Sequence, residues 1–442
     1  MSWITETAAL YDEIKEKVNN SDEWEPILPL YHSTGNAQIQ VTIFSDGTFS
    51  HAEVVDADDA KTIIPVTEDS SSRSSGIAPH PLCDKLIYIS GDYSTYVAKA
   101  KSNADEYFVT YIKALKAWAE SEYSDICITA IYDYLSKRML INDLIGDGIL
   151  KLKDAVLDEE YKITKSVKQI DSFVRFVVND LDSGENIKVW KSKVLFDKYI
   201  AYYESLGKKR DCQLCYASGK IVPVTYKHMA RIRNSGDSAK LISSNDDSNF
   251  TYRGRFANRE EAFAVGEIVS QKAHLALRWL IKTGGISVGD EKYVAWESRL
   301  NEIPNVFGRI VLDESENSGS FVKDKDDKVY AKTAEQYKNI IEMAIKGYKK
   351  NLNLNSSKVI LMALDSATPG RLSIIMYQEL TSTDFYKNIQ DWYSKVYWHS
   401  CYKTDDGEVI HCVQTPTPIE IARCAYGCLL YTSPSPRDRS VS

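Results

Sequence analysis

Residues 37–55 read AQIQVTIFSDGTFSHAEVV, and this stretch decides the fold. Apolar and polar residues alternate along 37–44 and again along 48–55, as they do in strands that bury one face. Ser45-Asp46-Gly47 separates the two runs, and Asp-Gly between alternating runs is a strong hairpin signal. The stretch therefore predicts two antiparallel strands joined by a tight turn.

Outside the hairpin, strand-like and helical segments follow one another without regular alternation. The sequence predicts further strands at 62–66, 170–178, 357–364 and 371–380. It predicts helices at 7–18, 94–120, 125–150, 186–205, 259–282, 333–350 and 383–398. Because these segments do not form repeated βαβ units, we expect an α+β, multi-domain fold with N-terminal mixed antiparallel sheets and long amphipathic helices.

The length of 442 residues suits about two to four domains. We predict an N-terminal α+β region at 1–155, with the hairpin and a polar loop, and a second α+β region with a basic segment at 156–398. Residues 399–427 would begin a C-terminal region. The tail at 428–442 opens with CLLYTSPSPRD, which resembles one reading frame of a common sequencing adaptor, so we expect it to be foreign.

The overall composition excludes several classes of protein. Hydrophobic residues make up 43% and charged residues 26%, which excludes a disordered or fibrous chain. The sequence lacks a signal peptide and any apolar run long enough to span a bilayer, so we expect a cytoplasmic protein without membrane contact. The net charge of −8 argues against a chain coated with nucleic acid, although one basic groove remains compatible with it.

Tyrosine is the unusual residue of the composition, with 28 Tyr against 12 Phe. Tyrosine is enriched at interfaces and wet grooves because it combines a ring with a polar hydroxyl. The alternative is that these residues simply replace Phe in half-buried strands and helices.

The eight cysteines are scattered, and the single close pair is Cys212-Gln-Leu-Cys215. Half a zinc ribbon has this spacing, but the second pair is missing. His228 or the Cys401 and Cys412 pair would complete a site only if the fold brought them close. Free thiols are the other reading, and we expect no metal and no cofactor.

Enzyme motifs are absent from the sequence. It contains no GxxxxGK[ST] phosphate loop, no HExxH and no GxSxG. The seven histidines are spread along the chain. We therefore predict no catalytic residue and no enzyme activity, although a pair of carboxylates acting as acid and base would leave no spacing signal.

Positive charge is concentrated between Gly207 and Lys240, where eight basic residues face two acidic ones, a balance of +6. Just beyond, Tyr252, Arg253 and Arg255 interleave guanidinium groups with a ring, a pattern suited to phosphate contact and base stacking. Residues 208–259 therefore predict a nucleic-acid groove, with a solvated basic face as the alternative.

The serine-rich loop at 68–81 is the second candidate, because its hydroxyls and backbone N–H groups surround a single cation. Its alternative is a flexible surface loop. We assign phosphate or groove-edge contact to Arg73 and Lys85, and stacking to Tyr252. Phosphate contact is assigned to Arg231, Arg233, Lys240, Arg253 and Arg255. The predicted nucleic-acid-binding residues are Ser72, Arg73, Ser74, Ser75, Lys85, Lys220, Lys227, Arg231, Arg233, Asn234, Lys240, Asn245, Tyr252, Arg253 and Arg255.

Several blocks of the chain resemble one known family. These blocks are 29–34 (PLYHST), 67–86, 233–256 and 363–373 (ALDSATPGRLS). They are similar to the large subunit of the type I-C (Dvulg-subtype) CRISPR Cascade complex, over residues 1 to about 427. Members of that family continue into a helical C-terminal region, so we expect this chain to be truncated.

The resemblance implies a non-catalytic subunit of an RNA-guided surveillance complex. Such a subunit recognises the protospacer-adjacent motif in duplex DNA, assists R-loop formation and recruits the helicase–nuclease, while guide pairing supplies sequence specificity. The implied partners are the backbone subunit, the CRISPR-RNA-processing or capping subunit, the small subunit, CRISPR RNA and target double-stranded DNA. The rival functions are a nucleic-acid-processing nuclease and a scaffold subunit that does not contact nucleic acid.

Overall fold

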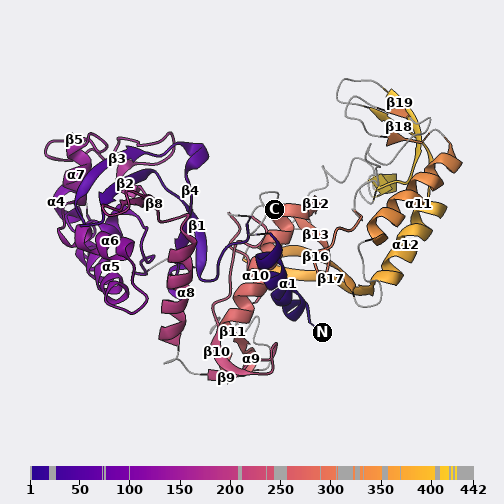
Figure 1. Ribbon diagram of the computed structural model, residues 1–442, viewed down its shortest axis with the longest axis horizontal. Helices are drawn as coiled ribbons and strands as arrows, with labels where there is room; N and C mark the ends of the chain where they lie inside the picture. The colour runs from indigo at the N-terminus through magenta and orange to yellow at the C-terminus, as the bar shows by residue number, and fades with distance from the viewer. Residues whose placement is uncertain are drawn as a thin grey trace, which may run out of the picture. The chain divides into compact units, whose positions relative to one another are not determined.

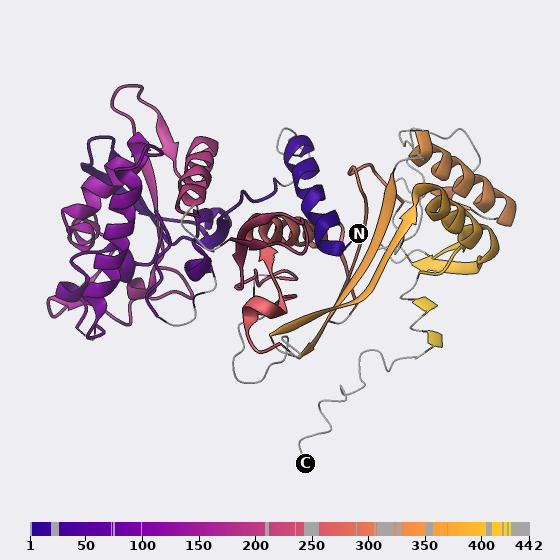
Figure 2. The same ribbon diagram turned by 90° about the horizontal axis from the view of Figure 1, so that it is seen from below.

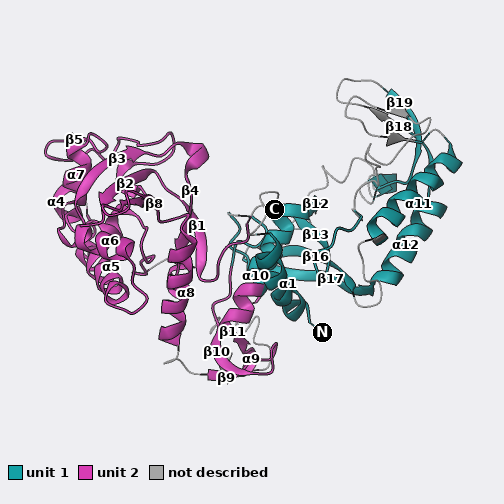
Figure 3. Ribbon diagram, viewed as in Figure 1, with its two compact units in different colours: residues 1–25, 230–241, 273–442 teal, residues 26–229, 242–272 magenta. Residues whose placement is uncertain are grey.

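The computed structural model shows two compact units built from a chain that passes between them several times (Figures 1 and 3). Unit 1 comprises Met1–Glu25, Ala230–Leu241 and Ala273–Ser442, and unit 2 comprises Pro26–Met229 and Ile242–Lys272. The structure describes residues 2–18, 26–71, 73, 76–98, 100–207, 212–234, 236–242, 256–288, 290–304, 306, 322–323, 329–331, 333–350, 357–368, 370–403, 409–417, 420–421 and 424–425.

The predicted α+β, multi-domain class is confirmed, since helices and mixed or antiparallel sheets occur together. The domain boundaries predicted at 155 and 398 stay predictions, and the two compact units follow a different division of the chain.

The predicted hairpin lies in a four-stranded mixed sheet of unit 2, with strand order β3-β2-β7-β8. The strands are β2 (Ile39–Phe44), β3 (Phe49–Val54), β7 (Val174–Asn179) and β8 (Asn186–Lys188). β2 and β3 pair antiparallel, and the turn closes with the Gly47 N–H donating to the Phe44 carbonyl at 2.9 Å. Gly47 has a φ of +75°, which explains the glycine at this position. β2 also pairs with β7 in parallel, so the sheet is mixed.

Helices and small strands surround this sheet, and the core of unit 2 lies between them and the buried faces of β2 and β7. Helix α6 packs against both of these strands, and α5 packs against α6. The remaining elements of unit 2 are β1 (His32–Asn36), β4 (Lys61–Pro65), α2 (Glu68–Ser71), α3 (Leu86–Ile89), α4 (Tyr93–Tyr96), α5 (Ala104–Ala119), α6 (Ile126–Ser136), α7 (Leu140–Gly146), β5 (Leu152–Lys153), β6 (Val156–Leu157), α8 (Lys193–Gly207), β9 (Cys212–Leu214), β10 (Ile221–Thr225), α9 (Arg259–Ala262) and β11 (Val265–Gly266).

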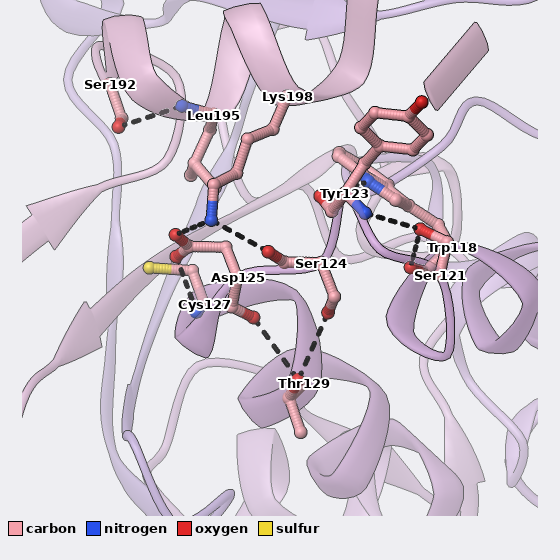
Figure 4. Close-up of polar contacts among 10 residues, drawn as sticks. All are labelled: Trp118, Ser121, Tyr123, Ser124, Asp125, Cys127, Thr129, Ser192, Leu195 and Lys198. Atoms are coloured by element: carbon pink, nitrogen blue, oxygen red, sulfur yellow. Dashed lines mark hydrogen bonds and ion pairs between the residues drawn. The ribbon is translucent and has the colours of Figure 1, made fainter. Parts of the chain in front are cut away.

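Helix α8 is tied to the start of α6 by one lysine (Figure 4). Lys198 Nζ donates to Asp125 Oδ2 at 2.9 Å and to the Ser124 carbonyl at 2.8 Å. The same carboxylate caps α6, because Asp125 Oδ1 accepts the Cys127 N–H at 3.1 Å. Burial alone would raise the pKa of Asp125, but the bonds from Lys198 and Cys127 outweigh it and lower the pKa. This tie fixes one side of α8, whose other contacts reach the polar loop.

Unit 1 contains an antiparallel sheet of order β12-β13-β16-β17, in which the two longest strands run side by side (Figure 2). Helix α1 lies by this sheet, since Lys358 Nζ of β16 is 3.7 Å from Glu6 Oε1. A second core joins α11, α12 and the hairpin of β18 and β19. The elements are α1 (Trp3–Lys17), β12 (Ile286–Val288), β13 (Glu291–Glu297), β14 (Val322–Lys323), β15 (Val329–Tyr330), α11 (Ala334–Lys350), β16 (Lys358–Thr368), β17 (Arg371–Thr381), α12 (Ser382–Lys395), β18 (Trp398–Lys403) and β19 (Val409–Gln414). α10 (Glu267–Gly284) spans the boundary between the units.

Three predicted long helices are interrupted, and the one predicted at 125–150 is α6 followed by α7. The helix predicted at 94–120 is α4 followed by α5, because Val97 adopts an extended conformation and turns its side chain into the core. The helix predicted at 259–282 is α9, the short strand β11 and then α10. The helix predicted at 186–205 begins late, since 186–188 form strand β8. In each case a tertiary contact overrides the local helical pattern.

Many tyrosines bury their rings and donate their hydroxyls to the backbone or to polar side chains. Tyr111 donates to the Leu82 carbonyl at 2.9 Å, and Tyr199 donates to the Val66 carbonyl at 3.0 Å. Tyr337 in unit 1 donates to Thr415 Oγ1 at 2.8 Å. For these residues, the reading of tyrosine as a core residue that replaces Phe applies. Within the described residues, no helix is both long and apolar enough to cross a bilayer.

Candidate nucleic-acid interface

The polar loop that follows β4 is held by a buried ion pair. Arg73 donates from Nη1 to Asp84 Oδ2 at 2.7 Å and from Nη2 to Asp84 Oδ1 at 2.5 Å. The Asp84 side chain is fully buried, and that of Arg73 is 16% exposed. The guanidinium also lies 4.3 Å from the centre of the Tyr88 ring and donates to the Ala78 carbonyl. Arg73 is therefore engaged inside unit 2, although it was predicted to contact phosphate.

The Asp84 carboxylate also organises the end of the loop. It accepts the backbone N–H groups of His80 and Lys85, both at 2.7 Å. Lys85 is the N-cap residue of α3, and its side chain is exposed. Lys85, just beyond the loop, thus faces solvent, whereas Arg73 inside the loop does not. The sequence carries one signal for this arrangement, because Asp84 directly follows the apolar Leu82 and Cys83, both of which are buried.

Helix α8 supports the start of the loop. The Glu68 N–H donates to the Tyr203 hydroxyl at 3.1 Å, and Tyr199 holds Val66 two residues earlier. His32 of β1 packs its ring edge-on against Phe196 and Tyr199, at 4.8 Å and 5.5 Å between centroids. Burial lowers the pKa of His32 to about 4, so its imidazole is neutral at pH 7.

The basic segment begins in unit 2 with a three-stranded antiparallel sheet of order β11-β10-β9. Lys220 lies in the turn between β9 and β10, and its side chain is exposed. The buried Cys215 Sγ accepts the N–H groups of Ser218 at 3.3 Å and Gly266 at 3.1 Å. Burial would raise the pKa of Cys215, but these hydrogen bonds outweigh it and lower the pKa. The Cys215 sulfur is therefore part of the structure of the turn.

The Cys212 and Cys215 pair was left open between zinc and free thiols. Cys215 is buried, and Cys212 is exposed. Within the described residues, no three His, Cys, Asp or Glu side chains are gathered in a way that could hold a metal ion.

The structure brings the polar loop and the hairpin of β9 and β10 together. Glu68 Oε1 accepts the Thr225 hydroxyl at 2.6 Å and the Lys227 N–H at 3.3 Å. Asp69 Oδ1 lies 2.5 Å from Lys227 Nζ. Both side chains of this second pair are exposed, at 41% for Lys227 and 68% for Asp69. Two regions about 160 residues apart in sequence thus contact each other within unit 2.

Four predicted residues lie in unit 1 and form a turn that pairs with β17. Arg233 Nε donates to Asp237 Oδ2 at 2.7 Å, and its Nη1 donates to the Asp290 carbonyl at 2.8 Å. The Lys240 backbone pairs with β17, donating to the Gly370 carbonyl at 3.2 Å and accepting the Leu372 N–H at 3.0 Å. Asn234 Oδ1 accepts the Gly236 N–H at 3.0 Å.

Arg231 is the exposed cation of this turn, with a φ of 60° and its N–H donating to the Asp237 carbonyl. Burial would raise the pKa of Asp237, but the Arg233 guanidinium and the Ala239 N–H outweigh it and lower the pKa. The predicted site residues are thus divided between the two units. Seven of them lie outside the described residues: Ser72, Ser74, Ser75, Asn245, Tyr252, Arg253 and Arg255.

Residues 9–438 match the model of a protein family described as CRISPR-associated protein (Cas_Csd1). The chain belongs to this family. A search of the curated proteins found no match to it. The resemblance to a CRISPR-associated protein is therefore confirmed. The type I-C subtype and the truncation stay predictions, as does the foreign origin of the tail, part of which lies inside the matched range.

Proposed function

We propose that this Csd1-family chain is the non-catalytic large subunit of a type I-C CRISPR RNA-guided surveillance complex. In this role it recognises the protospacer-adjacent motif of target double-stranded DNA, assists R-loop formation and recruits a helicase–nuclease. Its partners are the backbone subunit, the CRISPR-RNA-processing or capping subunit, the small subunit and the CRISPR RNA. The observation that carries the proposal is the family match over residues 9–438.

The surface of unit 2 supports the part of the proposal that concerns DNA. Lys85, at the start of α3, and Lys220, in the turn between β9 and β10, are exposed. The polar loop that precedes Lys85 is joined to the end of β10 by the Glu68–Thr225 hydrogen bond and to Lys227 by the ion pair of Asp69. Exposed lysines on a rigid support suit phosphate contacts, which position a duplex without reading its sequence. The exposed Arg231 supplies a further cation in unit 1. We assign backbone contact to these residues and leave motif reading to the residues outside the described ranges.

The proposal is tested by the salt dependence of target-DNA binding in the assembled complex. Each lost phosphate contact on B-DNA lowers the slope of log K against log salt by about 0.9. The triple variant Lys85→Ala, Lys220→Ala, Arg231→Ala is therefore expected to weaken binding and to flatten the slope by roughly two to three. Lys116→Ala, an exposed lysine that pairs with Glu120 on α5, is the matched control. An unchanged slope in the triple variant would refute the assigned contacts.

We also propose that the chain has no nuclease activity of its own, because its sequence carries none of the catalytic motifs sought above. Incubation of the purified protein with labelled DNA or CRISPR RNA and Mg²⁺ is expected to leave both intact. Metal-dependent cleavage that follows the protein through purification would show that the chain is a nuclease instead.

A further inference from the structure

The hairpin of β9 and β10 carries an exposed apolar patch. Among the large apolar side chains that the structure describes, Ile221 and Tyr216 have the two highest exposed fractions, 75% and 60%. Leu214 is 52% exposed and lies directly opposite Ile221 in the antiparallel register. We call Leu214, Tyr216 and Ile221 the hairpin patch. Large apolar side chains that gather on a surface commonly mark a binding site.

The backbone beneath the hairpin patch is rigid. The Cys215 N–H donates to the Lys220 carbonyl at 2.8 Å, and the Tyr216 N–H donates to the Ala264 carbonyl at 2.9 Å. The buried Cys215 sulfur accepts two further N–H groups, as described above. Gly219 adopts a φ of +68°, which lets the chain turn tightly. The turn therefore presents Tyr216 and Ile221 to solvent from a fixed position, so a ligand would bind without a large ordering cost.

Lys220 is the cation of the hairpin patch, because Lys227, the other lysine of 212–229, pairs with Asp69 of the polar loop. Residues 212–229 contain two lysines and no Asp or Glu. Lys220 is exposed in the turn next to Ile221. A ligand that suits these features combines flat apolar faces with negative charge. Unpaired nucleotides have this combination, because every base offers a π face and every linkage carries a phosphate.

We propose that the hairpin patch is a platform on which unpaired bases stack. Tyr216 stacks against a base, Ile221 and Leu214 contact the neighbouring base or sugar, and Lys220 pairs with a phosphate. Aliphatic side chains that enter between base steps are a known means of holding nucleic acid in an unstacked state. This inference rests on the proposed DNA-binding function and names a part of the surface that contacts single-stranded regions.

The test uses the full chain and a single-stranded oligonucleotide that contains 2-aminopurine, whose fluorescence reports base stacking. Tyr216→Ser is expected to weaken binding roughly 5- to 100-fold and to abolish the fluorescence change, because one stacked base is lost. Ile221→Ser is expected to weaken binding by several-fold. Tyr216→Phe is expected to retain binding because it keeps the ring. Lys220→Ala is expected to lower the salt slope by about 0.7, whereas Tyr216→Ser leaves the slope unchanged.

Val194→Ser and Leu181→Ser are matched controls, since these side chains are 59% and 58% exposed elsewhere in unit 2. If the wild-type chain binds with the expected salt dependence and Tyr216→Ser binds equally well, the stacking platform is wrong and the DNA-binding function stands. If the wild-type chain binds no single-stranded oligonucleotide while the assembled complex binds target duplex with the expected salt slope, the stacking platform is wrong and the proposed function stands. If the patch variants keep their nucleotide affinity but lose partner subunits during purification, the patch is a protein interface and the inference is overturned.

Discussion

The polar loop after β4 and the hairpin of β9 and β10 carry similar sequence signals but differ in the surroundings of their cations. In the loop, Arg73 makes two bonds to a fully buried carboxylate. In the hairpin, Lys220 faces solvent, and Lys227 pairs with an aspartate that is itself exposed. The comparison teaches that a cation among serines and glycines need not bind a ligand, because an acidic side chain of the protein itself can be its partner. Substitution of Arg73 should therefore lower the free energy of unfolding, whereas substitution of Lys220 should lower the affinity for nucleic acid.

The largest effect is expected from Arg73→Ala. Asp84 would remain buried without the guanidinium, and removal of one partner from a buried pair typically costs several kcal/mol. We expect a loss of about 3 kcal/mol in the free energy of unfolding, measured by urea denaturation. Lys168→Ala, which breaks the exposed pair with Glu160, is the control and is expected to change stability by less than about 0.5 kcal/mol. An unaltered urea midpoint in Arg73→Ala would show that the loop cation is no more important for stability than the exposed cations of the hairpin.

The second effect concerns pH and the support beneath the loop. His32 has a pKa of about 4 in the folded protein, against 6.5 for an ordinary histidine. Between these values the unfolded chain binds a proton that the folded chain does not, so stability falls as pH falls through this window and is fully present above pH 6.5. We expect a loss of about 2 kcal/mol between pH 7 and pH 5 from this residue.

Urea denaturation of wild type and of His32→Gln at both pH values measures the contribution of His32. The variant is expected to lack the corresponding part of the pH dependence, whatever its stability at pH 7. His51→Gln serves as the control, because His51 is exposed on β3. This variant should lose as much stability between pH 7 and pH 5 as the wild type does. Identical pH dependence in wild type and His32→Gln would show that the imidazole is not held neutral.

A smaller effect is expected from Tyr199→Phe, which removes the hydroxyl that holds Val66 just before the loop. The Val66 carbonyl would lose a buried hydrogen bond, which costs about 1 kcal/mol. Tyr216→Phe removes an exposed hydroxyl from the hairpin and is expected to leave stability unchanged. Thermal or urea unfolding of the two variants compares the regions directly. Equal losses would mean that the hairpin is as much a part of the core as the loop.

The smallest effect is expected from Lys227→Ala, which breaks the ion pair with Asp69. Both side chains are exposed, so water and salt screen the attraction and the expected loss is below about 0.5 kcal/mol. The loss is expected to shrink further as salt is raised. A loss as large as that of Arg73→Ala would indicate that the contact between loop and hairpin is structural.

The local parts of the fold could be predicted from the sequence. The hairpin of β2 and β3 follows from alternation and a single Asp-Gly step, and β16, β17 and α12 lie within a few residues of their predicted positions. The breaks at Val97 and before α10 could not be predicted, because they depend on contacts with distant residues. The same reason hides the pairing of β2 with β7, which lie more than 130 residues apart.

The kinds of residue that form the candidate site could be predicted from the sequence, but their contacts and exposure could not. Clustered charge identified the region that contains Lys220 and Arg231. Clustered charge did not reveal that Arg73 forms an ion pair with Asp84, nor that Lys227 forms one with Asp69, because pairing between side chains depends on the tertiary structure. The hairpin patch escaped notice for the opposite reason. Leu214 and Ile221 have the composition of core residues, and their exposure becomes visible in three dimensions alone.

The discontinuous make-up of unit 1 has a consequence for biosynthesis. Glu6 of α1 and its partner Lys358 of β16 lie about 350 residues apart in the chain, whereas Trp3 of α1 packs against the nearer His274 at 5.7 Å between ring centroids. At about 5 to 20 residues per second, roughly 20 to 70 s separate the synthesis of Glu6 from that of Lys358. Unit 2, whose residues all precede 273, can assemble during this interval. The ion pair between α1 and β16 therefore closes late, after all residues of unit 2 have been made.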